Sequence, residues 1–453
     1  MTSLADHEQL GAFLDVHLGS GAALDELKYC RESLAVRQKV EDRGPHRAYE
    51  GDGHDLQEAG WGIVISTKSD PRILEQLAPL LELRKAAAGK RFKEISFQEG
   101  TAPRAFLLNR DEPAGTPNFD KTPYYLLIAG GPDKIPFEVQ YHLAVERAVG
   151  RIAFDQLEDY GKYARAVVKA ETRGALMPRK MGIFDVGDVE EGDQRLAVMR
   201  DHFLDPLRED FSRIARSWEV ETVQDEEATR GALLEMLTGE SPAGCLVIGA
   251  HGARKGDLDE QRRHQGAPEC RDGAFDADSI PSDLRRQLVL LFSCFGAGTP
   301  EFDSFPKLGQ EKDAEFLTLK PFIAHLPKTL LSRGALAFMG HVDRGWTYSF
   351  AWEKKNGDEL PAATGFFDAF KKLMKGDRLG HAFRPLNRKC QAIGTELAEM
   401  MMDEMLLETT PGRLRHRNLL WVAYNNVRNF ITLGDPAIYP LGRSSGRRVY
   451  RSG

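Results

Sequence analysis

Residues 244–252 read GCLVIGAHG, and residues 287–296 read QLVLLFSCFG. Each stretch is an apolar run that ends in a glycine-containing turn, which is the pattern of a strand buried on both faces of a sheet. His251 stands just past the first run and Cys294 just past the second. Because neighbouring parallel strands end at the same edge of a sheet, we expect these two side chains to meet there.

Helical and strand-like runs alternate around this pair of strands. Apolar side chains at helical spacing indicate helices, and short runs that are apolar throughout indicate buried strands. On this basis we predict further strands at residues 61–67, 124–131, 180–186, 218–223 and 334–340, and helices at residues 71–90, 155–171, 194–215 and 226–237. This alternation is typical of an α/β fold in which helices cover both faces of a mostly parallel sheet.

The composition is that of an ordinary globular protein. The chain has 453 residues, of which 42% are hydrophobic and 28% charged, and this length suggests two or three domains. The net charge of −7 argues against a general nucleic-acid binder, which is usually basic. No apolar run is long enough to span a membrane, and residues 1–21 lack the features of a signal peptide. We therefore expect a soluble, cytoplasmic protein without direct nucleic-acid or membrane partners.

The five cysteines are odd in number and contain no CxxC motif. In a cytoplasmic protein this predicts free thiols, and it gives no support for a zinc site or any other metal site.

A histidine and a cysteine at one sheet edge suit nucleophilic catalysis. A thiolate is a strong nucleophile, and an imidazole can accept and return a proton near neutral pH. The glycines beside them let backbone N–H groups approach a reacting carbonyl, so we assign the oxyanion hole to the N–H groups of Gly252 and Cys294. A cysteine after a buried strand is more often an inert core thiol, but the matched positions of His251 and Cys294 favour a catalytic pair.

These motifs resemble those of the caspase-like (clan CD) cysteine peptidases. The match rests on VIGAHG and LLFSCFG, supported by LLIAGGPDKIPFEVQ with AVERAVGRI, by GALAFMGHVDRGWTYSF and by FITLGDPAIYPL. The resemblance covers about residues 124–440 and is greatest to the bacterial CHAT-domain and gingipain-like proteases.

The resemblance implies a caspase-like α/β/α sandwich with a mostly parallel sheet, plus an N-terminal α/β region. It divides the chain into an N-terminal regulatory or recognition region (1–120), a gingipain-like α/β subdomain (121–178) and a catalytic domain (179–453). Cys294 would be the nucleophile and His251 the acid/base, with no cofactor. Glu146 resembles a residue that could orient the histidine, and a solvated or ion-paired role for it is equally open.

The resemblance also implies that the segment after residue 340 lines the substrate groove. The candidate substrate-binding residues are His341, Asp343, Trp346 and Asp159. A carboxylate at Asp343 or Asp159 would pair with a basic P1 side chain, so cleavage after Arg or Lys is the favoured expectation. Two alternatives stay open: Arg344 selects an acidic P1 residue, or Asp343 and Arg344 form a local ion pair without a substrate role.

Peptidases of this group are commonly held inactive, so we expect control by a protein activator or inhibitor, or by proteolytic processing of a zymogen. A bacterial defence or cell-death pathway is the expected setting, and protein is the expected substrate. The alternatives are a catalytically silent interaction module with the same fold and a thiol enzyme of another kind, such as a transferase.

Overall fold

The computed structural model describes residues 53–440, apart from 114, 173–176, 189–193, 215–217, 255, 306–316, 319, 354–357 and 407–409. Residues 1–52, which form part of the predicted N-terminal region, lie outside the described residues, as does much of the polar segment between Thr299 and Lys320.

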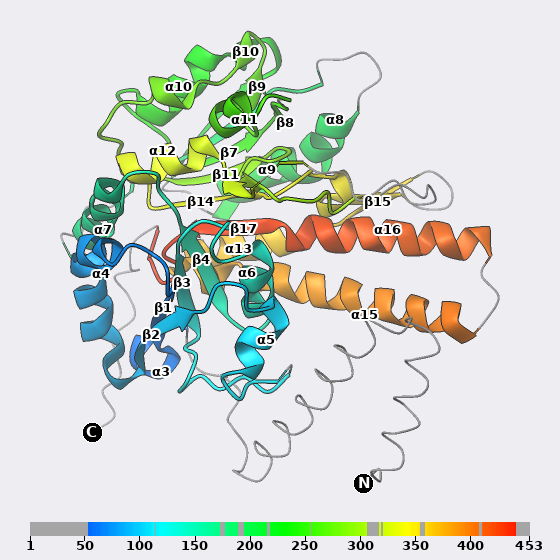
Figure 1. Cartoon of the computed structure of the whole chain (residues 1–453). Helices are drawn as coiled ribbons and strands as arrows, with labels where there is room; N and C mark the ends of the chain where they lie inside the picture. The colour runs from blue at the N-terminus through cyan, green and yellow to red at the C-terminus, as the bar shows by residue number, and fades with distance from the viewer. Residues whose placement is uncertain are drawn as a thin grey trace.

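The described residues build a ten-stranded sheet (Figure 1). Its strands, in spatial order, are β2 (Phe92–Phe97), β1 (Trp61–Ser66), β3 (Tyr125–Ala129), β4 (Ala148–Ile152), β17 (Phe430–Gly434), β14 (Ala337–His341), β11 (Leu288–Phe292), β7 (Cys245–Gly249), β5 (Lys180–Asp185) and β6 (Glu219–Gln224). Small two- and three-stranded sheets hold β8 (His251–Gly252), β9 (Pro268–Cys270), β10 (Gly273–Ala274), β12 (Gly298–Thr299), β13 (Phe322–Ile323), β15 (Ala351–Glu353) and β16 (Glu359–Pro361).

Two parallel halves make up the large sheet. Strands β2, β1, β3, β4 and β17 run in one direction, and β14, β11, β7, β5 and β6 run in the other. The halves join where β17 pairs antiparallel with β14, with Leu433 opposite Phe338. The prediction of a mostly parallel sheet is therefore confirmed, and the antiparallel junction is a feature that the apolar runs alone did not reveal.

Helices cover both faces of this sheet (Figure 1). They are α3 (Leu56–Ala59), α4 (Arg72–Ala88), α5 (Pro103–Leu108), α6 (Phe137–Ala144), α7 (Leu157–Thr172), α8 (Arg195–Met199), α9 (Asp205–Ile214), α10 (Arg230–Thr238), α11 (Leu258–His264), α12 (His325–Arg333), α13 (Thr364–Met374), α14 (Leu379–Ala382), α15 (Arg384–Leu406) and α16 (Pro411–Arg428). Helices α15 and α16 lie side by side and extend away from the sheet (Figure 1).

Strand alternation decides which helices cover which face. In β1, Ile63 belongs to the large core that includes α4 and α7, whereas Val64 belongs to a separate core with α5 and α6. Successive side chains of a strand point to opposite faces, so α4 and α7 cover one face here and α5 and α6 the other. The result is the predicted α/β/α sandwich.

The predicted helix at residues 194–215 is interrupted. A π-helical turn, η2 (Arg200–Leu204), separates α8 from α9. Pro206 falls in the first turn of α9, where its missing N–H costs little, so the irregularity precedes the proline.

The large sheet runs across the domain boundaries predicted at residues 120 and 178. Strand β1, from the predicted N-terminal region, pairs with β3, and the two halves share the β17–β14 junction. The functional division of the chain remains a prediction.

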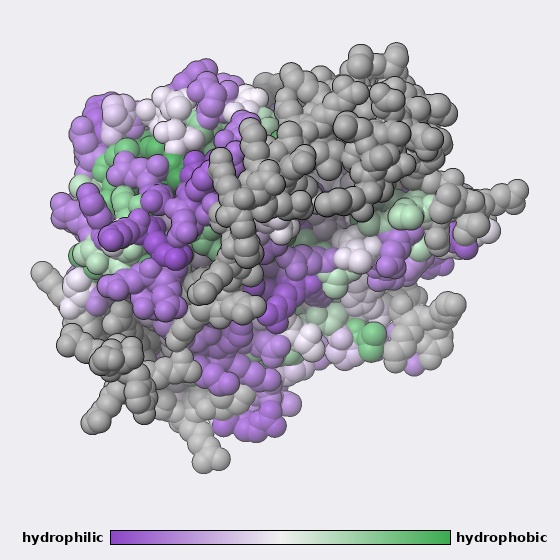
Figure 2. Space-filling view, turned by 90° about the horizontal axis from the view of Figure 1, so that it is seen from below, coloured by the Kyte–Doolittle hydropathy of each residue, from purple (hydrophilic) through white to green (hydrophobic). Residues whose placement is uncertain are grey.

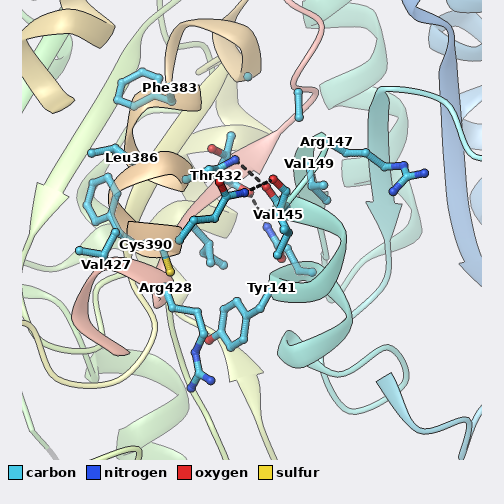
Figure 3. Close-up of a pocket in the computed structure, with 18 of the residues that line it drawn as sticks. Tyr141, Val145, Arg147, Val149, Phe383, Leu386, Cys390, Val427, Arg428 and Thr432 are labelled. Atoms are coloured by element: carbon cyan, nitrogen blue, oxygen red, sulfur yellow. Dashed lines mark hydrogen bonds between the residues drawn. The ribbon is translucent and has the colours of Figure 1, made fainter. Parts of the chain in front are cut away.

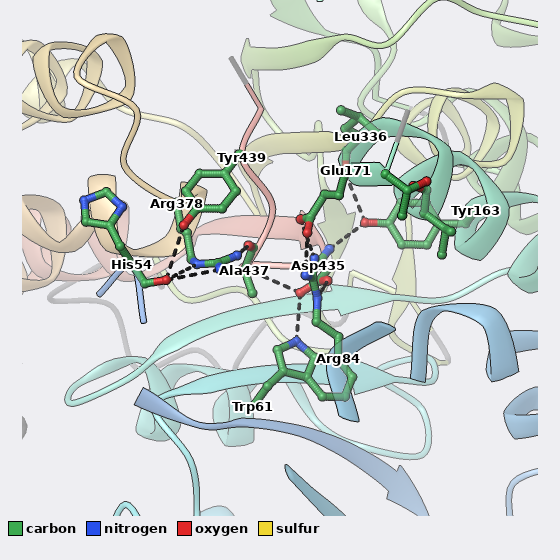
Figure 4. A network of polar contacts seen from close by, with 12 residues as sticks. His54, Trp61, Arg84, Tyr163, Glu171, Leu336, Arg378, Asp435, Ala437 and Tyr439 are labelled. Carbon is green, nitrogen blue, oxygen red and sulfur yellow. Dashed lines mark hydrogen bonds and ion pairs between the residues drawn. The ribbon is translucent and has the colours of Figure 1, made fainter. Parts of the chain in front are cut away.

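A buried polar network fastens the segment after β17 to the start of the described chain. The Asp435 carboxylate accepts a hydrogen bond from Trp61 Nε1 at 3.0 Å and pairs with Arg84 Nε at 2.7 Å. Arg84 also pairs with Glu171, and Tyr163 Oη accepts the N–H of Asp435 (Figure 4). Burial disfavours the charge on Arg84, but Asp435 and Glu171 outweigh it and raise the pKa of the guanidinium.

The described surface is dominated by hydrophilic residues on the face shown in Figure 2. Of the helices in the described part of the chain, none has both the length and the apolar character that a membrane crossing requires.

Asp435→Asn tests the network. The variant removes the charge that compensates buried Arg84, so the free energy of unfolding should fall by about 3–5 kcal/mol in urea denaturation. The matched control is Asp159→Asn, because Asp159 pairs with the largely exposed Lys162, and a loss of at most about 1 kcal/mol is expected there. Equal losses in the two variants would contradict a special role for Asp435.

Candidate active site

His251 and Cys294 occupy equivalent positions on neighbouring strands. Strands β7 and β11 pair in parallel with Gly249 opposite Phe292. His251 lies two residues past Gly249, and Cys294 lies two residues past Phe292. The register therefore brings both residues to the carboxyl edge of this half of the sheet, as the sequence predicted.

The backbones of the two turns touch at Gly252. A Cβ atom placed on Gly252 would overlap the carbonyl oxygen of Cys294 and lie 3.0 Å from its nitrogen. The short strand β8 holds this position through its antiparallel pairing with β9, in which His251 faces Glu269. Glycine is thus required beside the histidine because the cysteine backbone fills the space of a side chain.

One pocket contains both predicted catalytic side chains. It encloses about 490 Å³ and opens to solvent. Its described lining consists of Arg195, Leu196, Met199, Ala250, His251, Phe292, Ser293, Cys294, His341, Gly345, Trp346, Thr347 and Phe350. The lining comes from α8, from the carboxyl ends of β7, β11 and β14, and from the segment that follows β14.

The Cys294 thiol is partly exposed and lies 3.8 Å from the carbonyl oxygen of Gly345. Burial raises its pKa above the ordinary thiol value, and the contact with Gly345 and the charge of Arg195 oppose this effect only in part. The thiol is therefore protonated at neutral pH when no substrate is bound, so it needs a base during nucleophilic attack.

Two strained residues connect the turn after β11 to the end of β14. Phe295 has φ +59° and Asp343 has φ +79°, which side chains other than glycine rarely adopt. The N–H of Phe295 donates to the carbonyl of Asp343 at 2.6 Å, and the N–H of Ala297 donates to that of His341 at 2.9 Å. Strained backbone persists only where the surrounding structure holds it in place, and such residues cluster at functional sites.

His341 is the last residue of β14, and it forms part of the buried lining of the pocket. It is almost fully buried between Phe292 and Phe430, and burial lowers its pKa to about 4, against a smaller opposing effect of the neighbouring Asn426. Neither ring nitrogen makes a hydrogen bond of normal geometry with the described residues. The pocket therefore contains a neutral imidazole that can still hydrogen bond to a ligand.

Trp346 lines the pocket, and its backbone is hydrogen bonded to Asn426, a residue that was not predicted from the sequence. Asn426, buried on α16, accepts the N–H of Trp346 at 2.9 Å and donates to its carbonyl at 3.0 Å. It also donates to the Ser349 hydroxyl at 2.8 Å. No sequence signal marks this asparagine, because it is one polar residue of a long helix. Arg195 and Met199 of α8 were likewise not predicted.

Asp343 is fully buried, and it is absent from the described lining of the pocket. Its carboxylate accepts the backbone N–H groups of Ser304 at 2.8 Å and of Arg344 at 2.7 Å, and burial raises its pKa to about 6. The Arg344 side chain pairs with Asp303 and not with Asp343. The proposed local ion pair within Asp343–Arg344 is therefore replaced by a backbone hydrogen bond.

The other two predicted acids are not brought to the pocket. Glu146 lies just before β4, which is three positions from β11 in the sheet order. Asp159 lies in the first turn of α7 and pairs with Lys162 at 2.7 Å. Because β4 runs opposite to β11, the end of β4 that leads into α7 is at the other edge of the sheet from Cys294.

No protein-family model and no curated protein matches this sequence. A solved structure titled "Structure of Protease" is similar to the chain with a TM-score of 0.50 and 12% identity, covering 86% of this chain and 80% of that chain. The Saccharomyces cerevisiae separase–securin complex gives a TM-score of 0.34 and 11% identity, covering 69% of this chain and 16% of that chain. The first likeness shows a fold shared with a protease, and the observed sheet and layers agree with the predicted caspase-like sandwich.

Gly252→Ala tests the close approach of the two turns. The new methyl group must displace the Cys294 carbonyl, so we expect a loss of about 1–3 kcal/mol in the free energy of unfolding and an altered rate of Cys294 alkylation. Gly256→Ala is the matched control, since a Cβ there meets no atom within 4 Å. Indistinguishable variants would contradict the contact.

The pH dependence of alkylation tests the state of the thiol. Because only the thiolate reacts, a raised pKa means slow reaction at pH 7 and a rate that climbs with pH, with a midpoint above 9.0, the ordinary value for a thiol. Mass spectrometry of iodoacetamide-treated protein between pH 6 and 10 measures this rate at Cys294. A midpoint at or below pH 7 would show instead a thiolate stabilised in the resting enzyme.

Proposed function

We propose that this chain is a cysteine endopeptidase in which Cys294 is the nucleophile and His251 the general acid and base. The observation that supports this most strongly is the pairing of β7 and β11, which places both side chains in one pocket at one sheet edge. A fold shared with a protease is consistent with the proposal but does not by itself supply an activity.

The proposed reaction has two steps. His251 accepts the thiol proton as the sulfur of Cys294 attacks the peptide carbonyl carbon, and the backbone N–H groups of Gly252 and Cys294 donate to the oxyanion. The C–N bond then breaks, and His251 returns the proton to the leaving amine. Water hydrolyses the resulting thioester, with His251 again accepting the proton.

The natural substrate in this proposal is a protein, and a protein activator, an inhibitor or a proteolytic cut controls the enzyme. This part, together with a role in bacterial defence or cell death, rests on the resemblance to the caspase-like peptidases. The competing proposal is a catalytically silent interaction module.

The described lining of the Cys294 pocket favours an uncharged or acidic P1 side chain. None of these residues carries a carboxylate, His341 is neutral, and Arg195 supplies the one side chain among them with a permanent positive charge. A buried P1 guanidinium or ammonium would lack an opposite charge there. The basic P1 preference predicted from sequence depends on a carboxylate at Asp343 or Asp159. The Asp343 carboxylate already accepts backbone N–H groups, and Asp159 pairs with Lys162.

A fluorogenic peptide panel with Arg, Lys, Asp or Asn at P1 tests both parts. We expect the wild type to cleave the Asp or Asn peptides fastest. Cys294→Ala should lower kcat/KM by about 10⁴-fold or more, and His251→Ala by about 10²–10⁴-fold. His416→Ala, at an exposed histidine on α16, should leave cleavage unchanged.

Each other result has a definite meaning. Fastest cleavage after Arg or Lys would keep the peptidase and overturn the proposed pocket specificity. Cleavage that survives Cys294→Ala would overturn the proposed nucleophile. Absence of cleavage together with a Cys294 that no alkylating agent modifies would favour the silent module.

A further inference from the structure

A second and larger cavity lies beside the active-site half of the sheet. It lies between α6 and β4 on one side and α15 and α16 on the other (Figure 3). Its empty space is about 830 Å³, which includes the part open to solvent. Strands β17 and β14 contribute its floor through Phe430, Ile431, Thr432 and Met339. We call this cavity the α6–α16 cleft.

The chemistry of the cleft is that of a ligand site. Its apolar walls are formed by Ala144, Val145, Ala148, Val149, Met339, Phe383, Leu386, Val427, Phe430 and Ile431. A concave site with apolar walls and a few polar groups is typical of small-molecule sites. None of the described lining residues is an aspartate or glutamate.

Arg428 supplies a positive charge to this cleft. Its guanidinium lies over the ring of Tyr141, with 4.9 Å from Cζ to the ring centroid, and 5.5 Å from that of Tyr424. The buried Nε atom has no hydrogen-bond partner among the described residues. The other lining arginine, Arg147, pairs with Glu112 and points away from the cleft (Figure 3). The Arg428 guanidinium therefore lies beside Tyr141 at one end of the cleft, with an Nε atom that has no hydrogen-bond partner among the described residues (Figure 3).

Phe430 separates the cleft from the Cys294 pocket. Its side chain lines the cleft, and its ring stacks on Phe292 at 5.1 Å with an interplanar angle of 9°. It also lies 5.0 Å from the ring of His341. Phe292 and His341 both line the Cys294 pocket, so a ligand that moves Phe430 must change the packing beside the thiol.

We propose that the α6–α16 cleft binds a small ligand with an apolar body and one anionic group, and that its occupation alters the Cys294 pocket through Phe430. Ligand binding in the α6–α16 cleft does not depend on the proposed peptidase function. The proposal that this binding regulates activity does rest on that function. Arg428 would pair with the anionic group while the apolar body displaces water from the walls.

Two fluorescent probes that differ in charge test the binding site. 8-Anilinonaphthalene-1-sulfonate carries the anionic group, and N-phenyl-1-naphthylamine is its neutral analogue. We expect the anion to bind wild type about tenfold more tightly than the neutral probe, as a charge-assisted contact predicts. Arg428→Gln should abolish this preference, and Arg428→Lys should retain it. Val145→Trp, at an exposed position on the rim, should weaken both probes.

Cys390 locates the bound probe. It is a free, partly exposed thiol that lines the cleft, so saturating sulfonate probe should slow its alkylation by iodoacetamide at pH 9 at least fivefold. The buried thiols Cys245 and Cys270 serve as internal controls in the same mass spectra. Equal affinity for the two probes, or an unprotected Cys390, would overturn the site.

The coupling is measured at Cys294 without any peptide substrate. We expect the sulfonate probe to change the rate of Cys294 alkylation at least threefold in wild type. Phe430→Leu should bind the probe more weakly because Phe430 lines the cleft, and at saturating probe it should lose this change. Bound probe with an unchanged Cys294 rate would overturn the coupling. A Cys294→Ala protein that binds the probe normally separates failure of the peptidase proposal from failure of the cleft.

Discussion

Asp435 directly follows β17, and its carboxylate lies buried between Trp61 and Arg84, residues more than 350 positions earlier in the chain. A charge in this environment is tolerated only because Arg84 and the surrounding donors compensate it. The contact fixes the end of β17, and β17 is the strand that joins the two parallel halves of the sheet. The position of β14, and with it the wall of the Cys294 pocket, depends on this attachment.

The half of the sheet that carries His251 and Cys294 depends on a second constraint, which is close backbone packing. The backbone of Gly252 packs directly against that of Cys294, with no space for a side chain between the two turns. Phe295 and Asp343 both have strained backbone conformations, and a hydrogen bond between them connects the turn after β11 to the end of β14. Asn426 extends the same connection to α16 by holding both backbone groups of Trp346. Preorganised backbone of this kind suits a site that must hold a nucleophile, a base and oxyanion donors in fixed positions.

The aromatic residues between the two cavities are the link on which the proposed coupling depends. Phe292, His341 and Phe430 form one packed group, with the Cys294 pocket on one side and the α6–α16 cleft on the other. Close-packed rings transmit displacement because they have no free volume to absorb it. A peptidase whose thiol is protonated at rest would be responsive to such displacement, since small changes in burial alter the pKa of the thiol.

The sequence by itself determined most of the strands of the large sheet, the α/β sandwich, and the placement of His251 and Cys294 at adjacent strand ends, but it did not predict strands β2, β4 and β17. These features follow from local periodicity and from the rule that parallel strands end at one edge. Only the tertiary structure decided that β17 pairs antiparallel with β14, that Asp343 binds backbone N–H groups, that Asp159 and Glu146 lie away from the pocket, and that Asn426 supports Trp346. The physical reason is that the environment of a polar side chain is set by segments distant in the chain, whose packing no local pattern records.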